Sequence, residues 1–312
     1  MQDDRWEREA LRELALEGIR ERRRGRRWGI FFKALFFGYL VLVLALALGW
    51  LPGTTETTAR PHAAMVEVDG VILPGGENDA ETINRALRRA FSGEQSRGVI
   101  LEVNSPGGSP VQANRINQEI RRLKEEYPDT PLYVVAGDMF TSGAYYLAVS
   151  ADAIYVDPAT MVGSIGVMMN GFGFHEAMER LGIERRLHTA GESKAFMDPF
   201  SEERPEDVER LQRLLDSIHE QFIEAVREGR GDKLTDDDTI FSGEVWTGPE
   251  SIELGLVDDI GSVQHVVRDV IGVEHMRDYT IRPNLLERFG RGIGVAIGET
   301  LAGHLFGPAP FE

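Results

Sequence analysis

The chain has 312 residues, of which 42% are hydrophobic and 27% are charged, and it contains no cysteine. This composition excludes a largely disordered or fibrous protein, and the absence of cysteine excludes disulfide scaffolds, thiolate metal sites and cysteine nucleophiles. The formal net charge is −17. Because residues 1–33 carry ten Lys and Arg against seven Asp and Glu, the rest of the chain has a balance of −20. An acidic body repels phosphates, so no nucleic-acid partner is expected.

The strongest signal near the N-terminus is an uncharged apolar run from Ala34 to Leu51. At ~1.5 Å per residue such a helix is about 27 Å long, close to the ~30 Å hydrocarbon core of a bilayer. Arginine-rich sequence precedes the run, which by the positive-inside rule places residues 1–33 in the cytoplasm as a charged helical segment. The sequence therefore predicts a single-pass anchor at 34–51 in the inner or plasma membrane, with the following residues on the extracytoplasmic, periplasmic side. A cleavable signal peptide is the alternative, but the long leader and the absence of an A-x-A-like site argue against it.

Beyond the anchor, residues 52–61 have the Gly, Thr and Pro content of a linker. The expected elements are then, in chain order, strands 65–68 and 71–73, helix 79–92, strand 98–103, helix 110–127, strand 132–136, helix 142–150, strands 153–156 and 165–169, helix 173–181, strand 184–189 and helix 205–229. Apolar strands alternating with amphipathic helices predict one α/β domain over 62–282 with largely parallel, buried strands. The C-terminal tail, 283–312, either docks on a neighbouring subunit or lies on the membrane surface, and the sequence leaves both open.

Three clusters contain residue types that catalysis uses. Asn104–Gly108 (NSPGG) follows an expected strand; its glycines form either a tight turn or backbone N–H groups that face a ligand oxygen. Ser142, in the TSGAYY sequence after the next strand, is either a helix cap or a nucleophile. Lys194, in GESKAFM, is either a solvated lysine or, if desolvated, a base for a serine. The seven histidines show no metal-ligand spacing, so no metal is expected.

Taken together, these motifs resemble the signal peptide peptidase A family of membrane-anchored Ser-Lys serine proteases, in its short single-domain type. The resemblance rests on NSPGG at 104–108, TSGAYY at 141–146, GSIG at 163–166, GESK at 191–194, and the pair VWTG and GLVDDIG at 245–248 and 255–261. It implies a Clp-protease/crotonase-like spiral of ββα units preceded by one transmembrane helix. The departures are Phe140, Thr141 and Ala144, where the family commonly has small residues.

The resemblance implies a role for each matching residue. Ser142 would be the nucleophile and Lys194 the general base; Ser164 would help to orient the lysine amine, and the backbone N–H groups of Gly108 and Gly143 would form the oxyanion hole. No cofactor is implied. The implied substrates are remnant signal peptides and other hydrophobic membrane-associated peptides, and the implied assembly is a homo-oligomeric ring, with an octamer possible. Whether Ser142 and Lys194 meet within one chain or between chains is left open.

Three other functions remain as alternatives. A crotonase-like acyl-CoA enzyme would share the fold but would need neither Ser142 nor Lys194. A catalytically inactive membrane scaffold would need no dyad at all, so the presence of both residues argues against it. A Ser-His-Asp hydrolase would pair Ser142 with His188, which substitution of the histidine would decide.

Overall fold

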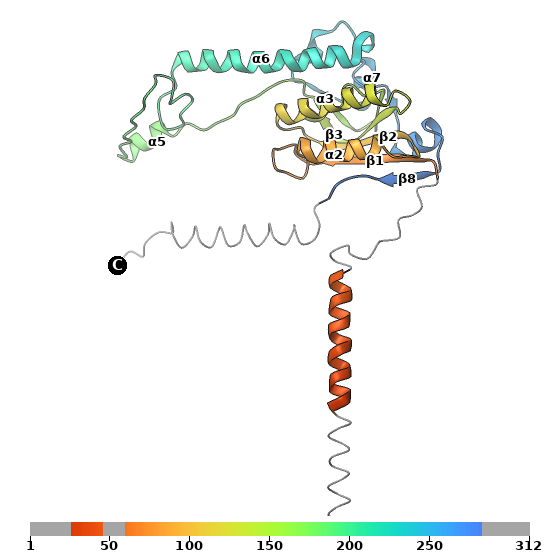
Figure 1. Ribbon diagram of the computed structural model, residues 1–312. Coiled ribbons are helices and arrows are strands. Elements are labelled where there is room, and N and C mark those ends of the chain that lie inside the picture. The colour runs from red at the N-terminus through yellow and green to blue at the C-terminus, as the bar shows by residue number, and fades with distance from the viewer. Residues whose placement is uncertain (1–25, 46–59, 283–312) are drawn as a thin grey trace, which may run out of the picture. The chain divides into compact units, whose positions relative to one another are not determined.

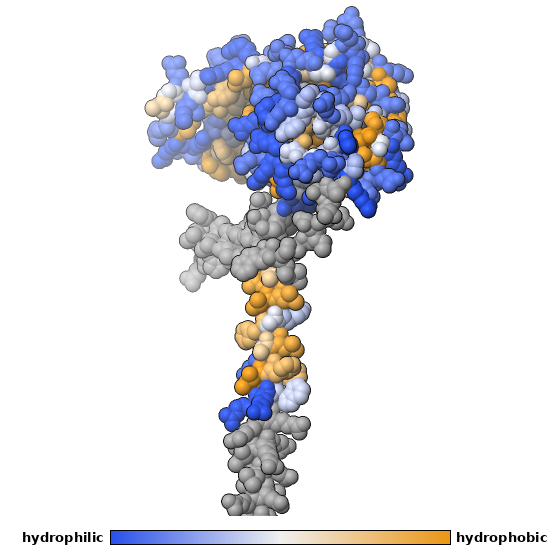
Figure 2. Space-filling view, turned by 45° about the vertical axis from the view of Figure 1, so that its right-hand side comes forward, coloured by the Kyte–Doolittle hydropathy of each residue, from blue (hydrophilic) through white to orange (hydrophobic). Residues whose placement is uncertain are grey.

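The computed structural model describes residues 26–45 and 60–282 (Figure 1). The first range is one helix, Arg26–Ala45, whose 20 residues are long and apolar enough to cross a membrane. Figure 2 shows hydrophobic residues along most of this helix and hydrophilic ones near its N-terminal end. The helix begins eight residues before the predicted anchor. Residues 46–51 of that anchor, the segment 1–25 and the tail 283–312 lie outside the described residues.

Residues Thr58–Pro283 form a compact unit built around one eight-stranded sheet. The strand order is β6-β5-β3-β2-β1-β8, with β4 beside β3 and β7 beside β4. All pairs are parallel except β5 with β6. The strands are β1 (His62–Asp69), β2 (Ser96–Ser105), β3 (Leu132–Thr141), β4 (Ala153–Val156), β5 (Met161–Gly163), β6 (Val245–Trp246), β7 (Asp259–Ile260) and β8 (His275–Asp278).

The first two helices of the domain begin at residues whose side chains cap them. Asp79 accepts a hydrogen bond from the Thr82 backbone N–H (2.8 Å), and Ser109 caps the next helix, which has Pro110 in its first turn. The helices of this unit are α2 (Ala80–Phe91), α3 (Pro110–Glu126), α4 (Gly143–Ala148), α5 (His175–Arg180), α6 (Pro205–Arg230), α7 (Gly248–Glu253) and α8 (Val263–His265). The single turns are η1 (Gly231–Lys233), η2 (Asp238–Phe241) and η3 (Val266–Val270).

Different helices pack on the two faces of the sheet. Helices α2, α3 and α4 pack with alternate strand residues such as Val99, Leu101 and Val103 in the larger hydrophobic core. On the opposite face, α8 and η3 pack on a smaller cluster that includes Ile100 and Val135. This α/β architecture of mostly parallel strands is the predicted class.

Three predicted strands are wrong in whole or in part. Residues 71–73 make only an isolated bridge, between Ile72 and Gly108. Neither 165–169 nor 184–189 forms a strand, because the chain leaves the sheet after β5 and these segments have no neighbouring strand to pair with in the described domain. Within 165–169, Ile165 is buried in the core, whereas Met168 (84% accessible) and Met169 (59%) are exposed.

The segment 167–204, which we call the arm, extends away from the sheet together with the N-terminal half of α6 (Figure 1). Large apolar side chains on it face solvent, among them Phe172 (81% accessible) and Leu181 (74%). The apolar stripe expected on this helix is Val208, Leu211, Leu214, Leu215, Ile218, Phe222 and Ala225. Only Phe222 and Ala225, near the C-terminal end of α6, are buried. The upstream members Val208 and Leu214 are exposed. The stripe therefore continues well past the surface that its own domain covers.

Candidate active site

Ser142 lies between the end of β3 and the start of α4. Its backbone N–H donates to the Gly163 carbonyl (2.7 Å), and its carbonyl accepts from the Tyr146 N–H (2.9 Å) in the first turn of α4. Its backbone has φ 53° and ψ −125°, a left-handed conformation that a residue with a Cβ rarely adopts. Although Ser142 occupies the N-cap position, its side chain makes no cap hydrogen bond. The interpretation of this serine as only a helix cap is therefore not supported.

The loop of Gly107 and Gly108 packs directly against this turn. A Cβ added at Gly107 would lie 2.7 Å from the Gly143 nitrogen and 2.9 Å from the Ser142 Cβ. A Cβ added at Gly108 would lie 2.1 Å from the Ile72 carbonyl oxygen. Both positions therefore require glycine, because the backbones of the two loops approach too closely for any side chain.

The backbone N–H groups of Gly108 and Gly143 are free to donate to a ligand oxygen. Among the described residues neither N–H has a hydrogen-bond acceptor, and Gly143 is the first residue of α4, where helical N–H groups lack partners. The Gly107 N–H, by contrast, donates to the Ser105 Oγ (3.1 Å). A Cβ added at Gly143 would lie 3.1 Å from the Gly108 nitrogen, so the two donors are neighbours. The geometry thus favours Gly108 over Gly107 as the second donor.

Ser164 directly follows Gly163, whose carbonyl accepts the Ser142 backbone N–H. In the ladder between β3 and β5, Thr141 pairs with Gly163, which brings Ser142 and Ser164 to the next positions of adjacent strands. Ser164 has φ 52°, and its N–H donates to the Glu244 carbonyl (2.6 Å). The structure therefore brings Ser142, Ser164, Gly108 and Gly143 together.

Trp246 is a contributor that the sequence interpretation missed. A Cβ added at Gly163 would lie 2.5 Å from the Trp246 ring, so the indole packs on the backbone that accepts the Ser142 N–H. The tryptophan belongs to the VWTG sequence, which served only to identify the family. No local pattern indicates that this motif lies against residues 163–164, because the contact depends on the antiparallel pairing of β5 and β6.

A buried network supports α4 from behind. The Tyr145 hydroxyl donates to the Leu256 carbonyl (2.7 Å), and complete burial raises the pKa of this tyrosine. Nearby, the Arg230 Nη1 donates to Asp258 (2.8 Å). Burial alone would raise the pKa of Asp258, but hydrogen bonds from Arg230 and Lys233 outweigh it and leave the pKa below its usual value. The network fixes the helix that begins one residue after Ser142.

Lys194 does not reach this site within one chain. It is an exposed residue of the arm, two positions before Phe196, and Phe196 lies against Arg210 of α6 (5.5 Å). The helix contacts the site region through Phe222, which stacks on Tyr146 (4.7 Å between ring centroids). The twelve residues from position 210 to 222 span about 18 Å of helix, so the lysine is remote from Ser142 in its own chain.

Among the described residues no histidine side chain is hydrogen-bonded to the Ser142 hydroxyl. His188 is exposed on the arm, and His219 of α6 contacts the Ile165 carbonyl (3.1 Å). Within residues 26–45 and 60–282, no three His, Asp or Glu side chains are grouped so that they could hold a metal ion. The site as described thus consists of a strained serine, a second serine and two free backbone donors.

Known proteins that are similar to most of this chain carry two different kinds of name. A protein of Brucella abortus named Na(+)/H(+) antiporter NhaA is 38% identical over 77% of this chain, which aligns with only 34% of that protein. Protease 4 of Haemophilus influenzae is 33% identical over 74% of this chain and 38% of its own length. The chain thus spans about a third of the length of these relatives.

One solved structure is similar to most of the domain. It is the 1510-N membrane-bound stomatin-specific protease in complex with a substrate peptide, with a TM-score of 0.46 and 14% identity over 75% of this chain and 98% of that one. The model of Peptidase family S49 matches residues 125–272, which include Ser142, Ser164 and Lys194. Residues 125–272 therefore match a domain of Peptidase family S49.

Proposed function

We propose that this protein is a serine endopeptidase in which Ser142 is the nucleophile. The observation that carries the proposal is the Ser142 turn: a serine without a cap bond, in a conformation that favours glycine, beside the free N–H groups of Gly108 and Gly143. A strained turn between a strand and a helix is the arrangement that exposes a nucleophile, and convergent backbone N–H groups stabilise a developing oxyanion.

The general base in this proposal is Lys194 of a neighbouring copy of the chain. The domain from 60 to 282 contains three lysines; Lys124 and Lys233 are paired with Asp152 (2.8 Å) and Asp258 (2.6 Å). Lys194 makes no ion pair with any described residue, and it cannot reach the serine of its own chain. A second copy that covers Lys194 would remove its amine from water, and desolvation favours the neutral amine that activates a serine.

The arm supports association between copies. Its apolar side chains and the uncovered part of the α6 stripe are exposed in the single chain, and clustered exposed apolar side chains mark interaction surfaces. Such a surface buries itself against protein, and cyclic homo-oligomers are the common solution. A homo-oligomeric ring, with an octamer possible, would place each arm on the next domain and supply the lysine to its Ser142.

The reaction then follows acyl-transfer chemistry. The neutral amine of Lys194 takes the proton of the Ser142 hydroxyl while the oxygen forms a bond to the peptide carbonyl carbon. The N–H groups of Gly108 and Gly143 stabilise the oxyanion, a contribution of about 3–4 kcal/mol per donor in comparable sites. The lysine returns the proton to the leaving amine, and water then hydrolyses the acyl-enzyme. Ser164 would orient the amine.

The helix Arg26–Ala45 suggests where the enzyme works. In this proposal it anchors the chain in the inner or plasma membrane, with the arginine-rich N-terminus in the cytoplasm and the protease domain on the periplasmic side. An anchored protease there would meet hydrophobic peptides held in the membrane. We therefore propose remnant signal peptides and similar membrane-associated peptides as substrates.

A serine-reactive phosphonate tests this proposal directly. The full chain, in detergent, is incubated with the probe, and mass spectrometry locates the modified residue. We expect modification of Ser142 in the wild type, none in Lys194→Ala, and wild-type labelling in the control Lys124→Ala. An unlabelled Ser142 in a folded oligomer would overturn the proposal in favour of an acyl-CoA enzyme or an inactive scaffold, and loss of labelling in His188→Ala would instead indicate a histidine base.

A further inference from the structure

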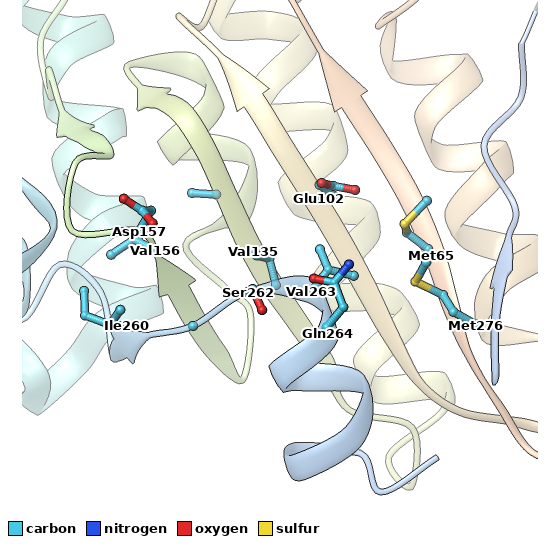
Figure 3. Close-up of a pocket in the computed structure, with 12 residues that line it drawn as sticks. Met65, Glu102, Val135, Val156, Asp157, Ile260, Ser262, Val263, Gln264 and Met276 are labelled. Carbon is cyan, nitrogen blue, oxygen red and sulfur yellow. The ribbon is translucent and has the colours of Figure 1, made fainter. Parts of the chain in front are cut away.

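A cavity of about 550 Å³ lies on the sheet face that α8 covers, the face opposite to α2 and α3. Figure 3 shows the Glu102 side chain and the thioethers of Met65 and Met276 in this cavity, with Gln264 near them from the α8 side. The rest of the lining is mostly apolar. A second carboxylate, Asp157, also lines the cavity, and its Oδ1 accepts a hydrogen bond from the Ala159 N–H (2.9 Å). The cavity therefore has a largely apolar wall and few polar groups, as small-ligand sites do.

Glu102 is the carboxylate on this face that its own chain leaves unpaired. Glu67, which lies directly opposite it on β1, and Asp278 both form ion pairs with Arg282. Asp69 accepts a hydrogen bond from the Asn104 side chain (3.0 Å). Among the described residues, the Glu102 carboxylate has neither a hydrogen bond nor an ion pair.

This arrangement costs stability in the free protein. Like charges opposite each other in a ladder repel, and burial, followed by Glu67, Asp278 and Asp69, raises the pKa of Glu102. A cation placed in the cavity would remove this penalty. An unpaired carboxylate opposite a second carboxylate is unfavourable in the free protein, and such an unfavourable position often marks a ligand site.

We propose that the cavity is a subsite for a lysine or arginine side chain of the peptide substrate, with the cationic head on Glu102. The aliphatic stem of such a residue would lie against Met65, Met276 and Val263, which an inorganic cation could not exploit. This inference rests on the proposed peptidase function and adds a specificity determinant to it.

The position of Glu102 sets the expected spacing in the substrate. Glu102 precedes the oxyanion donor Gly108 by six residues along the chain, and its register partner Val135 precedes Ser142 by seven. Because β2 ends at Ser105, a rise of ~3.3 Å per residue gives at most about 20 Å between the cavity and the scissile bond, which an extended peptide covers in about six residues or fewer. A basic residue at that separation should therefore be preferred.

Binding to the inactive full chain tests the subsite without catalysis. Ser142→Ala is titrated with fluorescent apolar peptides that differ only in lysine or norleucine placed four to eight residues from the expected cleavage point, on either side. We expect about tenfold tighter binding of one lysine peptide near a six-residue spacing, and loss of that preference when Glu102→Gln is added. Glu67→Gln is the matched control, since it removes the opposite, already paired carboxylate, and should keep the preference.

A small free ligand tests binding in the cavity without a peptide. n-Butylguanidinium should raise the melting temperature of the wild type and of Glu67→Gln, but not that of Glu102→Gln, while 1-pentanol should not discriminate between them. Equal binding of lysine and norleucine peptides at all spacings, or a lysine preference that survives in Glu102→Gln, would overturn the inference. Both measurements are independent of turnover, so a failure of the dyad proposal would not be mistaken for a failure of the subsite.

Discussion

The strained backbone of Ser142 leads to a prediction about stability that is separate from activity. Both Ser142→Ala and Ser142→Gly remove the hydroxyl, and neither loses a cap hydrogen bond, because the wild-type side chain makes none. Only the glycine also removes the Cβ that makes φ 53° unfavourable. The strain of such a residue is about 1–3 kcal/mol, and the greater chain entropy of glycine in the unfolded state offsets roughly 0.5–1 kcal/mol of the gain.

We therefore expect Ser142→Gly to be about 1 kcal/mol more stable than Ser142→Ala, with both variants inactive. For a domain of this size that corresponds to a melting temperature roughly 2–4 °C higher. Thermal unfolding of the full chains, followed by near-UV circular dichroism at one protein concentration, measures the difference, since association makes the midpoint depend on concentration. A glycine variant that melts below the alanine variant would refute the claim that the fold holds this serine under strain.

Three further predictions concern the oxyanion donors, the acid stability and the arm. Gly108→Ala should lower the melting temperature and reduce kcat about 10²–10³-fold, because its Cβ would lie 2.1 Å from the Ile72 carbonyl and must displace the donor; peptide hydrolysis at a temperature at which circular dichroism shows the variant folded checks this. The hydrogen bond from Arg122 outweighs burial and holds the pKa of Glu119 at about 2, below its ordinary 4.5, so its stabilisation is complete above pH 4.5 and is lost as the pH falls toward 2. Urea unfolding should accordingly show Glu119→Gln to be less stable than the wild type at pH 7, with the difference shrinking at pH 3. Leu214→Glu should dissociate the oligomer in light scattering and abolish activity while the isolated fold stays intact, since this leucine is exposed in the single chain.

Local sequence patterns were sufficient for the central part of the fold and site. Buried apolar strands followed by capped helices predicted β1 to β3 and α2 to α4 within a few residues, because these elements carry periodic patterns and local stop signals. The clusters that contain Gly108, Ser142 and Gly143 stood out for the same reason, whereas the roles expected of these residues came from the resemblance to a peptidase family. Each cluster directly follows a buried strand, and the carboxyl ends of parallel strands meet at one edge of the sheet.

The remaining parts depend on contacts that no local pattern encodes. The residues at 165–169 have the composition of a strand, but a strand also needs a neighbour, and the chain has left the sheet there. The contact of Trp246 with Gly163 follows from an antiparallel pairing of segments more than eighty residues apart. Lys194 is remote from Ser142 because the long helix α6 carries the arm away from the sheet. The sequence could not show this, because an exposed apolar stripe has the same periodicity as a buried one.

Complementation between two inactive variants tests most directly the claim that Ser142 of one chain works with Lys194 of another. Ser142→Ala and Lys194→Ala are co-expressed in equal amounts with different tags, and the mixed oligomer is isolated and assayed on a hydrophobic peptide. Random assembly would give about a quarter of the sites an intact serine and an intact lysine from different chains, so roughly a quarter of wild-type activity is expected. Mixed oligomers as inactive as either variant alone would contradict a dyad shared between chains.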